Sequence, residues 1–539
     1  MVAAASFLFL PIMKSLQFPG FRFFRILMLV CGSALAVASA SAAGTRPNIV
    51  FFLVDDMGWQ DTSVQFHSGK TPFNSYFRTP SMERLAGNGV RFTQAYSCAV
   101  CTPSRVSWMI GQNATRHHVT NWTLKGETSH SSPKLLPPQW KMKGLQPGDA
   151  PTAAGLLHDA GYRTIHVGKA HWGAVGTKGE NPLNLGFDVN IAGHAAGAPE
   201  SYQGLDRYGE GKPGKEVWAV PGLEEYKGRD VHLTDALTIE ACRGMEKSVK
   251  ELHKPFFLYL AHYAVHSPLQ YHRPYDEHYK DQQVAVSEKQ YASMVEGMDA
   301  SLGKVLDKLK ELGVAGETLV VFYTDNGGVS HAVRGKNILG SGKDTHNKPL
   351  REGKGSAYEG GIRVPAIVSW AQPQPDSPLQ KRIPVSSNAR CPRPVIIEDL
   401  FPTFLKWAGA PLPKDSPVDG GDITPLLGNP AETSRPTPLF WHFPNVWTPY
   451  PKDRHVGYQP HSVIRSGDWK AIYFYEDESW ELYNLATDLG ENTNLADKEP
   501  ARLAELAGTL FDRLKATQSP WPVDRATGAP RVMKLPSKP

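Results

Sequence analysis

The sequence predicts an α/β protein: a large, mostly parallel sheet sandwiched by helices, followed by a smaller C-terminal domain of antiparallel sheet and helix. Short apolar runs rich in β-branched and aromatic residues alternate with helical segments, as in sheets covered on both faces. Near residues 433–438 a Pro/Ser/Thr-rich stretch leads into closely spaced strand-like runs. With 539 residues, 41% of them apolar, the chain can bury a large core.

Residues 1–43 have the features of a signal peptide. Lys14, Arg22 and Arg25 precede an apolar run at 26–36, and the small residues at 37–43 offer A-x-A cleavage positions. Because the apolar run is too short to span a membrane comfortably, we expect an exported protein, periplasmic or secreted, without a stable membrane anchor. The net charge is +5 and no basic block stands out, which argues against a nucleic-acid partner.

The elements follow in chain order. We expect strands at 49–54, 164–167, 256–260 and 319–323, and helices that open at Thr79-Pro80-Ser81 and over 152–160, the second ending at Gly161. These belong to a catalytic α/β domain at 44–434. The C-terminal domain, 435–539, should contain strands at 439–442, 470–475 and 480–485 and a helix from about residue 500. One face of that helix carries Leu503, Leu506, Leu510 and Leu514.

Polar residues follow each predicted strand of the large sheet, in this order: Asp55 and Asp56, Lys169 and His171, His266, Asp325 and Asn326. Ligands of open parallel sheets bind at the carboxyl ends of the strands, so these side chains should converge on one crevice. Carboxylate and amide oxygens suit calcium, with magnesium as the alternative, rather than zinc. Taken singly, each group also has a structural interpretation as a cap, a turn or a buried histidine.

Cys98 and Cys101 have C-x-x-C spacing, which raises a redox pair or a metal site as an alternative. Neither a small βαβ context nor a second cysteine pair accompanies it. The residues after Cys101 indicate another role: Thr102 can cap a helix and Pro103 fits its first position, which puts Cys101 at a helix N-terminus, where the dipole favours an anion. Arg105 lies in the same first turn, so a tetrahedral anion would be favourably bound.

The run Cys101-Thr102-Pro103-Ser104-Arg105, closed by Gly111, resembles the hallmark of the type I sulfatases of the alkaline-phosphatase-like superfamily. Other motifs recur in that family's order: Asp55-Asp56, the run 168–173, the segment ending at 266–268, the run 324–328, then 350–355 and 358–361. The resemblance runs from Asn48 to Arg363. Ile110, Ala170, Trp172 and Glu352 depart from the commoner residues, which bears on pocket shape rather than on reactive groups.

The resemblance implies a sulfatase whose nucleophile is the hydrate of C-formylglycine (3-oxoalanine), made from Cys101 by a formylglycine-generating maturation enzyme. It implies a calcium site formed by Asp55, Asp56, Asp325, Asn326 and the modified Cys101. Asp325 would accept the nucleophile's proton, Arg105 and Lys169 would hold the sulfate charge, and His266 with Lys354 would protonate the leaving alcohol. A sulfo-enzyme intermediate would form, and His171 would help to release sulfate from it.

The substrate is expected to be a sulfated saccharide, as for similar bacterial exported arylsulfatases and polysaccharide sulfatases. The segments 184–202, which contains His194, and 441–450, which begins at Trp441, are candidate pocket walls, and ordinary loops are the alternative. Two rival functions stay open: a phosphodiesterase or phosphonate hydrolase of the same fold, and a sulfated-glycan-binding protein without catalysis.

Overall fold

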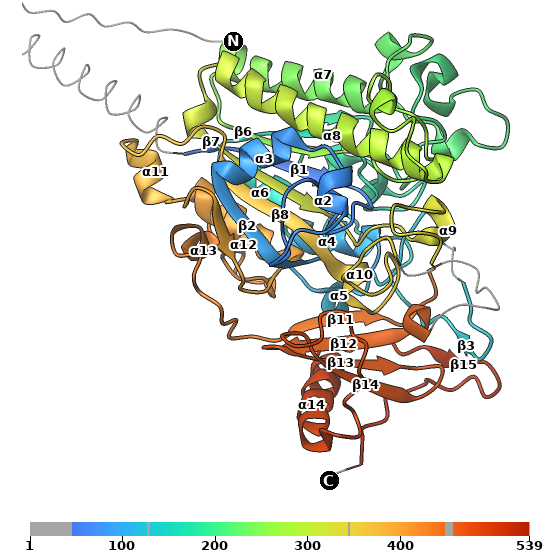
Figure 1. The fold of residues 1–539 in the computed structure, drawn as a ribbon. Helices are drawn as coiled ribbons and strands as arrows, with labels where there is room; N and C mark the ends of the chain where they lie inside the picture. Colours follow the sequence, from blue (N-terminus) through green and yellow to red (C-terminus); the bar gives the residue numbers. More distant parts are fainter. Residues whose placement is uncertain (1–45, 127–129, 343–344, 448–455, 538–539) are drawn as a thin grey trace, which may run out of the picture. The chain divides into compact units, whose positions relative to one another are not determined.

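The computed structural model describes residues 46–126, 130–342, 345–447 and 456–537 (Figure 1). The predicted signal peptide, residues 1–43, lies outside the described residues. Within the described part of the chain, no helix combines the length and apolar character needed to cross a bilayer.

A nine-stranded mixed sheet forms the centre of the α/β region. Its order is β10 (Val395–Ile396), β2 (Gly89–Tyr96), β8 (Arg363–Trp370), β7 (Thr318–Thr324), β1 (Asn48–Val54), β6 (Phe256–Ala261), β4 (Arg163–Gly168) and β5 (Val189–Ile191), with β9 (Ala389–Cys391) also paired to β2. β7, β1, β6, β4 and β5 run parallel, whereas β8 is antiparallel to both of its neighbours. The predicted fold class and the four predicted strands are confirmed.

Helices cover both faces of this sheet, and β1 shows the division (Figure 1). Val50 and Phe52 pack in one core with α3 (Pro80–Gly87), α7 (Leu233–Glu246) and α8 (Val286–Glu311). Phe51 and Leu53 pack in a second core with α4 (Cys101–Ile110), α6 (Ala153–Asp159) and α12 (Leu400–Ala408). Both faces of β1 are therefore buried, which explains its continuous apolar sequence.

The two predicted helix starts differ in how they are capped. The Thr152 side chain accepts a hydrogen bond from Gly155 N and caps α6. Thr79 precedes α3, but its hydroxyl contacts Thr62 and Ser63 instead. The free N–H groups of α3 are bound by Asp299 of α8, which accepts from Ser81 N and Met82 N at 2.8 Å each. A residue distant in sequence therefore supplies this cap.

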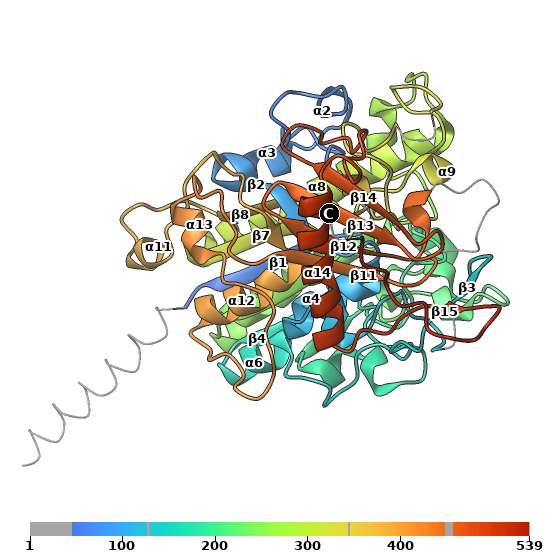
Figure 2. The same ribbon diagram turned by 90° about the horizontal axis from the view of Figure 1, so that it is seen from below.

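The C-terminal sheet has the order β11 (Leu439–Phe443), β12 (His461–Ser466), β13 (Trp469–Phe474) and β14 (Ser479–Asn484), all antiparallel. One face packs on Tyr96 and Tyr358 of the α/β region. The other face is covered by α14 (Pro500–Ala516) (Figure 2). The four predicted leucines of α14 make this contact. The antiparallel sheet and its helix are confirmed, and the boundary between residues 434 and 435 remains a prediction.

Short elements complete the described fold: α2 (Phe73–Tyr76), α5 (Ala114–His117), α9 (His331–Arg334), α10 (Glu359–Ile362), α11 (Pro378–Arg382), α13 (Thr424–Gly428), and β3 (Leu135–Leu136) paired with β15 (Val523–Asp524).

Candidate active site

The structure brings the predicted polar residues together at one edge of the large sheet. β1, β7, β6 and β4 end side by side, with Val54 in register with Thr324 and Gly168 with Ala261. The loops that follow these strands carry Asp55, Asp56, Asp325, Asn326, Lys169, His171 and His266. The parallel register of the strands therefore brings together residues that are far apart in sequence. The largest separation is 271 positions, between Asp55 and Asn326.

Three buried carboxylates each contact a buried cation. Arg105 donates to Asp325 Oδ2 from Nε at 2.9 Å and contacts the same oxygen from Nη2 at 2.8 Å. Lys354 Nζ lies 2.6 Å from Asp56 Oδ1, and Lys169 Nζ pairs with Asp55 Oδ2. The side chains of all six are at most 1% exposed. Each of the three carboxylates therefore has its own cationic partner.

The carboxylates are crowded, and their donor atoms fit a divalent cation. Burial, reinforced by Asp325, raises the pKa of Asp55 well above its ordinary value. Burial would also raise the pKa of Asp56, but Lys354 and His266 outweigh it and hold the pKa below its usual range. Among the described residues, Asp55 Oδ1 and Asn326 Oδ1 are buried without a hydrogen-bond partner. Hard oxygen donors left unsatisfied in this way suit calcium or magnesium.

Asp56 and His171 both adopt left-handed backbone conformations, with φ of 62° and 54°. Non-glycine residues seldom do so, and such strain is concentrated at functional sites. The Asp56 side chain accepts from Asn326 Nδ2 at 2.7 Å, and His266 Nε2 lies 3.6 Å from its other oxygen. Asp55, Asp56 and His266 each offer a ligand atom within 4.8 Å of the others, so His266 joins the metal-site geometry, a contact that sequence reasoning missed.

Cys101 begins α4, so the helix starts earlier than predicted. Val100 is the N-cap residue and Pro103 is the third helical residue, not the first. Thr102 does not cap the helix; its hydroxyl lies 3.2 Å from His171 Nε2 and accepts from Thr123 N at 3.3 Å. Cys101 still occupies the helix N-terminus, where unpaired N–H groups favour an anion. Burial raises the pKa of its thiol.

The two histidines have different hydrogen-bonding patterns. His171 Nε2 lies 2.8 Å from the carbonyl oxygen of Thr123, an acceptor, so Nε2 carries the proton and Nδ1 offers a lone pair. His266 Nδ1 lies 2.7 Å from the carbonyl oxygen of Ser267, so there the proton is on Nδ1. Burial, with Lys354 close by, lowers the pKa of His266 to about 3, and burial lowers the pKa of His171 well below its ordinary value.

A cavity of about 440 Å³ opens onto this centre. Cys101, His171, His266 and Lys354 line it, together with Trp122, Trp218, Trp447, Lys215 and the segment 197–200, among others. Within the first predicted wall, 197–200 lines the cavity, whereas His194 does not. Trp441 of the second wall is buried under the C-terminal sheet, where its indole N–H donates to Ser97 O; Trp447 lines the cavity in its place. Residues 448–450 lie outside the described residues.

The wall that contains Trp447 is tied to the α/β region by three adjacent contacts. Asn445 Nδ2 donates to Thr120 Oγ1 at 2.8 Å, Asn121 Nδ2 to Val446 O at 3.3 Å, and Trp122 Nε1 to Trp447 O at 2.9 Å. The segments 120–122 and 445–447 therefore form one wall. Sequence reasoning missed Trp122, Trp218 and Lys215, because a loop tryptophan or lysine carries no local signal of what it lines.

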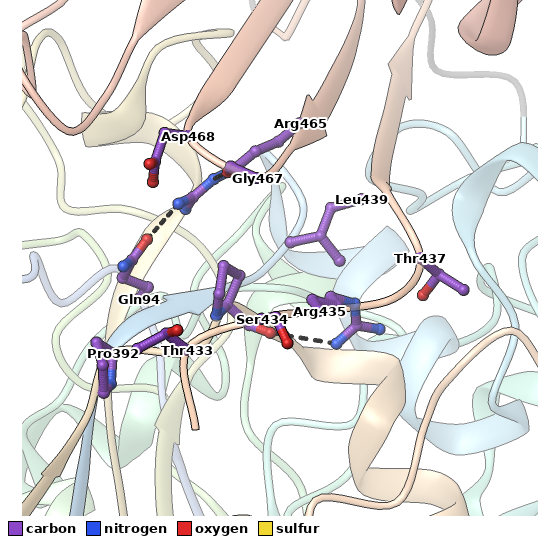
Figure 3. Close-up of a pocket in the computed structure, with 11 residues that line it drawn as sticks. Gln94, Pro392, Thr433, Ser434, Arg435, Thr437, Leu439, Arg465, Gly467 and Asp468 are labelled. Atoms are coloured by element: carbon purple, nitrogen blue, oxygen red, sulfur yellow. Dashed lines mark hydrogen bonds between the residues drawn. The ribbon is translucent and has the colours of Figure 1, made fainter. Parts of the chain in front are cut away.

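A second cavity, of about 340 Å³, lies between β2, the segment 433–439 and the turn between β12 and β13 (Figure 3). None of the predicted site residues lines it. Its two arginines are held by protein groups: Arg435 contacts both oxygens of Asp399 at 2.6 and 2.9 Å, and Arg465 donates to Tyr96 and Gln94. The chemistry is therefore concentrated at the first cavity.

The Cys98-x-x-Cys101 pair is not a disulfide, and the four cysteines of the described residues are all free. Cys98 is buried with Sγ 3.9 Å from Ser107 Oγ. The single cluster of three or more potential metal-binding His, Cys, Asp or Glu groups found among the described residues contains no cysteine.

Comparison with known proteins gives consistent matches. The model of the sulfatase family matches residues 47–410, and the C-terminal model of N-sulphoglucosamine sulphohydrolase matches residues 354–519. A sulfatase of Formosa agariphila is 30% identical, with 88% of this chain and 89% of that protein covered. Human N-acetylgalactosamine-6-sulfatase is 29% identical, with 85% of this chain and 77% of that protein covered.

Solved structures agree. The crystal structure of Ps i-CgsB in complex with k-i-k-neocarrahexaose superposes with a TM-score of 0.67 at 27% identity and covers 88% of this chain and 94% of that one. The phosphonate monoester hydrolase of Agrobacterium radiobacter has a TM-score of 0.56 at 17% identity, with 89% and 100% covered, which shows a shared fold alone.

Proposed function

Because the chain belongs to the sulfatase family and hydrolyses sulfate esters, we propose that Cys101, oxidised to formylglycine, supplies its nucleophile beside a calcium ion, and that its substrate is a sulfated saccharide. The observation that carries the proposal is the position of Cys101. It begins a buried helix and lines the same cavity as His171, His266 and Lys354. The three carboxylate–cation pairs adjoin it.

The proposed calcium ligands are Asp55, Asp56, Asp325, Asn326 and the modified Cys101. Their free oxygen atoms support this assignment, since Asp55 Oδ1 and Asn326 Oδ1 lack partners in the described part of the chain. When bound, the ion supplies positive charge that polarises the nucleophile and a sulfate oxygen. A divalent cation would add positive charge to a site that already holds three cationic side chains, which suits an anionic ester.

The chain's own groups have separable roles in the proposal. Arg105, Lys169 and Lys354 are fixed cations that stabilise developing negative charge without rearranging. Asp325, held by Arg105, accepts a proton from the nucleophile. His171 accepts a proton at Nδ1, the nitrogen left free by the contact of Nε2 with Thr123 O.

Protonation of the leaving alcohol is assigned to His266 together with Lys354, which both line the cavity and both lie near the carboxylate of Asp56. His266 has a low pKa here, whereas the pKa of Lys354 is raised: burial would lower it, but Asp56 and the other acidic groups outweigh burial. The ammonium of Lys354 is therefore the proton reserve of this pair.

The cavity walls support a sugar substrate. Trp122, Trp218 and Trp447 present indole surfaces, and such flat apolar faces suit the C–H faces of a sugar ring, while Lys215 and Glu200 add polar groups. The crystal structure of Ps i-CgsB holds a neocarrahexaose, which supports an oligosaccharide ligand for this chain as well. The proposal also includes export of the protein and its maturation by a formylglycine-generating enzyme.

Mass spectrometry of the peptide containing Cys101, taken from protein made in its native host, tests the nucleophile. We expect the aldehyde or its hydrate in place of the thiol. The Cys101→Ala variant should lose turnover of sulfate esters, while its folding and its calcium binding stay largely intact. A thiol throughout, or near-normal turnover by the variant, would contradict the proposal and favour a glycan-binding protein or another nucleophile.

Paired rates on sulfate and phosphate esters of one alcohol test the reaction class. We expect the sulfate ester to be the faster substrate, because the chain belongs to the sulfatase family. A faster phosphate diester or phosphonate would indicate the phosphonate-hydrolase alternative, whose fold this chain shares.

A further inference from the structure

A cluster of fully buried charged and aromatic residues lies behind the proposed metal site. It consists of Asp61, Glu288, Tyr291 and Arg334, and we call it the buried clamp. Each of the four side chains is at most 1% exposed. None of them lines the 440 Å³ cavity, so the substrate does not explain them.

Arg334 is the centre of the buried clamp. It contacts both oxygens of Glu288, from Nε at 2.7 Å and Nη2 at 2.8 Å, and reaches Asp61 Oδ2 from Nη1 at 2.9 Å. Its guanidinium stacks on the Tyr291 ring, 3.8 Å from the ring centroid. A planar fork that bridges two carboxylates while stacking on an aromatic face is a geometry that arginine alone provides.

Tyr291 connects this cluster to a proposed calcium ligand. Its hydroxyl lies 2.6 Å from Asp61 Oδ2 and 3.1 Å from the main-chain oxygen of Asp56. Both are acceptors, so the single hydroxyl proton is shared between them. Asp56 has a left-handed backbone, a conformation that persists only where neighbouring contacts enforce it. Asp61 also accepts from Gly58 N at 2.9 Å, which holds the turn between the two acids.

The buried clamp joins both loops that carry the proposed ligands. Asp61 belongs to the loop after β1, which carries Asp55 and Asp56. Arg334 ends α9, which follows the loop after β7 that carries Asp325 and Asn326. Glu288 and Tyr291 anchor both loops to α8.

We propose that Tyr291 and Arg334 are positioning residues that fix the spacing between these two loops and thereby set the affinity for calcium. The proposal rests on the proposed metal site and adds residues that contact neither ion nor substrate. Partners behind metal ligands of this kind typically change metal affinity 10- to 100-fold, roughly, when removed.

The test is calorimetric titration of calcium into chelator-treated full-length protein. Tyr291→Phe removes one hydroxyl and leaves the charges of the buried clamp paired. Tyr162→Phe is the matched control, because Tyr162 is also buried and its hydroxyl donates to a main-chain oxygen, Pro47 O, at 2.7 Å, at the opposite end of the sheet. A second variant, Arg334→Lys, keeps the positive charge but cannot bridge both carboxylates in the same way.

We expect Tyr291→Phe to raise the calcium Kd about tenfold or more. Tyr162→Phe should keep the wild-type Kd even if its melting temperature falls equally, and the KM for an aryl sulfate at saturating calcium should stay unchanged in both. A wild-type Kd in Tyr291→Phe and in folded Arg334→Lys would overturn the positioning role alone. Absence of calcium binding by the wild-type protein would overturn the metal site and the positioning role together.

Discussion

Gly197 approaches His171, the proposed proton acceptor, more closely than a side chain allows. A Cβ atom added there would lie 2.3 Å from His171 Cε1, 2.6 Å from Nδ1 and 2.8 Å from Nε2. Ordinary contacts begin near 3.4 Å, so Gly197→Ala must move the ring or the loop by roughly 1 Å. His171 has little freedom, since its backbone is left-handed and its Nε2 contacts Thr123 O.

A displacement of about 1 Å in a catalytic group can cost on the order of 100-fold in rate. We therefore expect Gly197→Ala to lower kcat for an aryl sulfate by about that factor, with a loss of about 1–3 kcal/mol in the free energy of unfolding. The assay is initial rates over a range of substrate concentrations, with thermal melts to confirm folding. Gly69→Ala is the control, because a Cβ at Gly69 meets no atom within 4 Å.

A kcat within threefold of wild type, in a folded Gly197→Ala variant, would refute the reasoning. It would mean that His171 tolerates displacement and does not transfer a proton in a rate-limiting step. An equal loss in Gly69→Ala would point instead to a general sensitivity of the fold.

Further predictions concern the cavity, the metal and stability. Trp218→Ala should raise the KM for a sulfated oligosaccharide about tenfold, because Trp218 lines the cavity. Trp480→Ala, in β14 and outside the cavity, should leave this KM unchanged. Equal effects of the two substitutions in steady-state kinetics would contradict a sugar-binding role for the cavity wall. Calcium at 100 times its Kd should raise the free energy of unfolding by about 2.7 kcal/mol, measured by calorimetry. The Asp55→Asn variant should not show this stabilisation. If chelators leave the stability of the wild-type protein unchanged, the proposed calcium site is contradicted. Burial raises the pKa of Glu398 to about 8. Between about pH 5 and 8 the folded state therefore keeps a proton on Glu398 that the unfolded state releases. The free energy of unfolding should fall as the pH rises through this range. Melts of Glu398→Gln should show a weaker decline over that range, and parallel curves would disprove the assignment. Gly508→Ala, in α14 with open space around it, should gain about 0.5–1 kcal/mol in denaturant unfolding, and a loss would contradict this.

Sequence reasoning predicted that the polar groups of the candidate site lie close together, because strand ends and motif order are local signals. Asp55, Lys169 and Asp325 each directly or almost directly follow an apolar run, and parallel pairing then brings them together. The spacing of the leucines in α14 likewise predicted a helix with one buried face, and the structure confirms it. Each of these inferences needs only a short window of sequence and the geometry of one element.

Other features depend on contacts between distant segments and were missed or wrong. Thr79 and Thr102 are of a residue type that often caps helices. In the fold, however, the Thr79 hydroxyl contacts Thr62 and the Thr102 hydroxyl contacts His171, and both partners are distant in sequence. Trp441 and Trp447 are six residues apart in one aromatic stretch. Trp441 lies within β11 and is buried, whereas Trp447 follows the end of that strand and lines the cavity. Tyr291 and Arg334 read as ordinary helix residues until their partners are known.

The burial of Cys101 has a consequence for the order of events in the life of the protein. All ten residues of α4 are buried, and Cys101 is 4% exposed and lines a cavity whose other walls come from segments between Trp122 and Trp447. A second enzyme that oxidises this side chain needs it in an extended, accessible segment, which the finished helix does not offer. We therefore expect the proposed conversion to take place before the chain folds, and a molecule that folds first to keep its thiol.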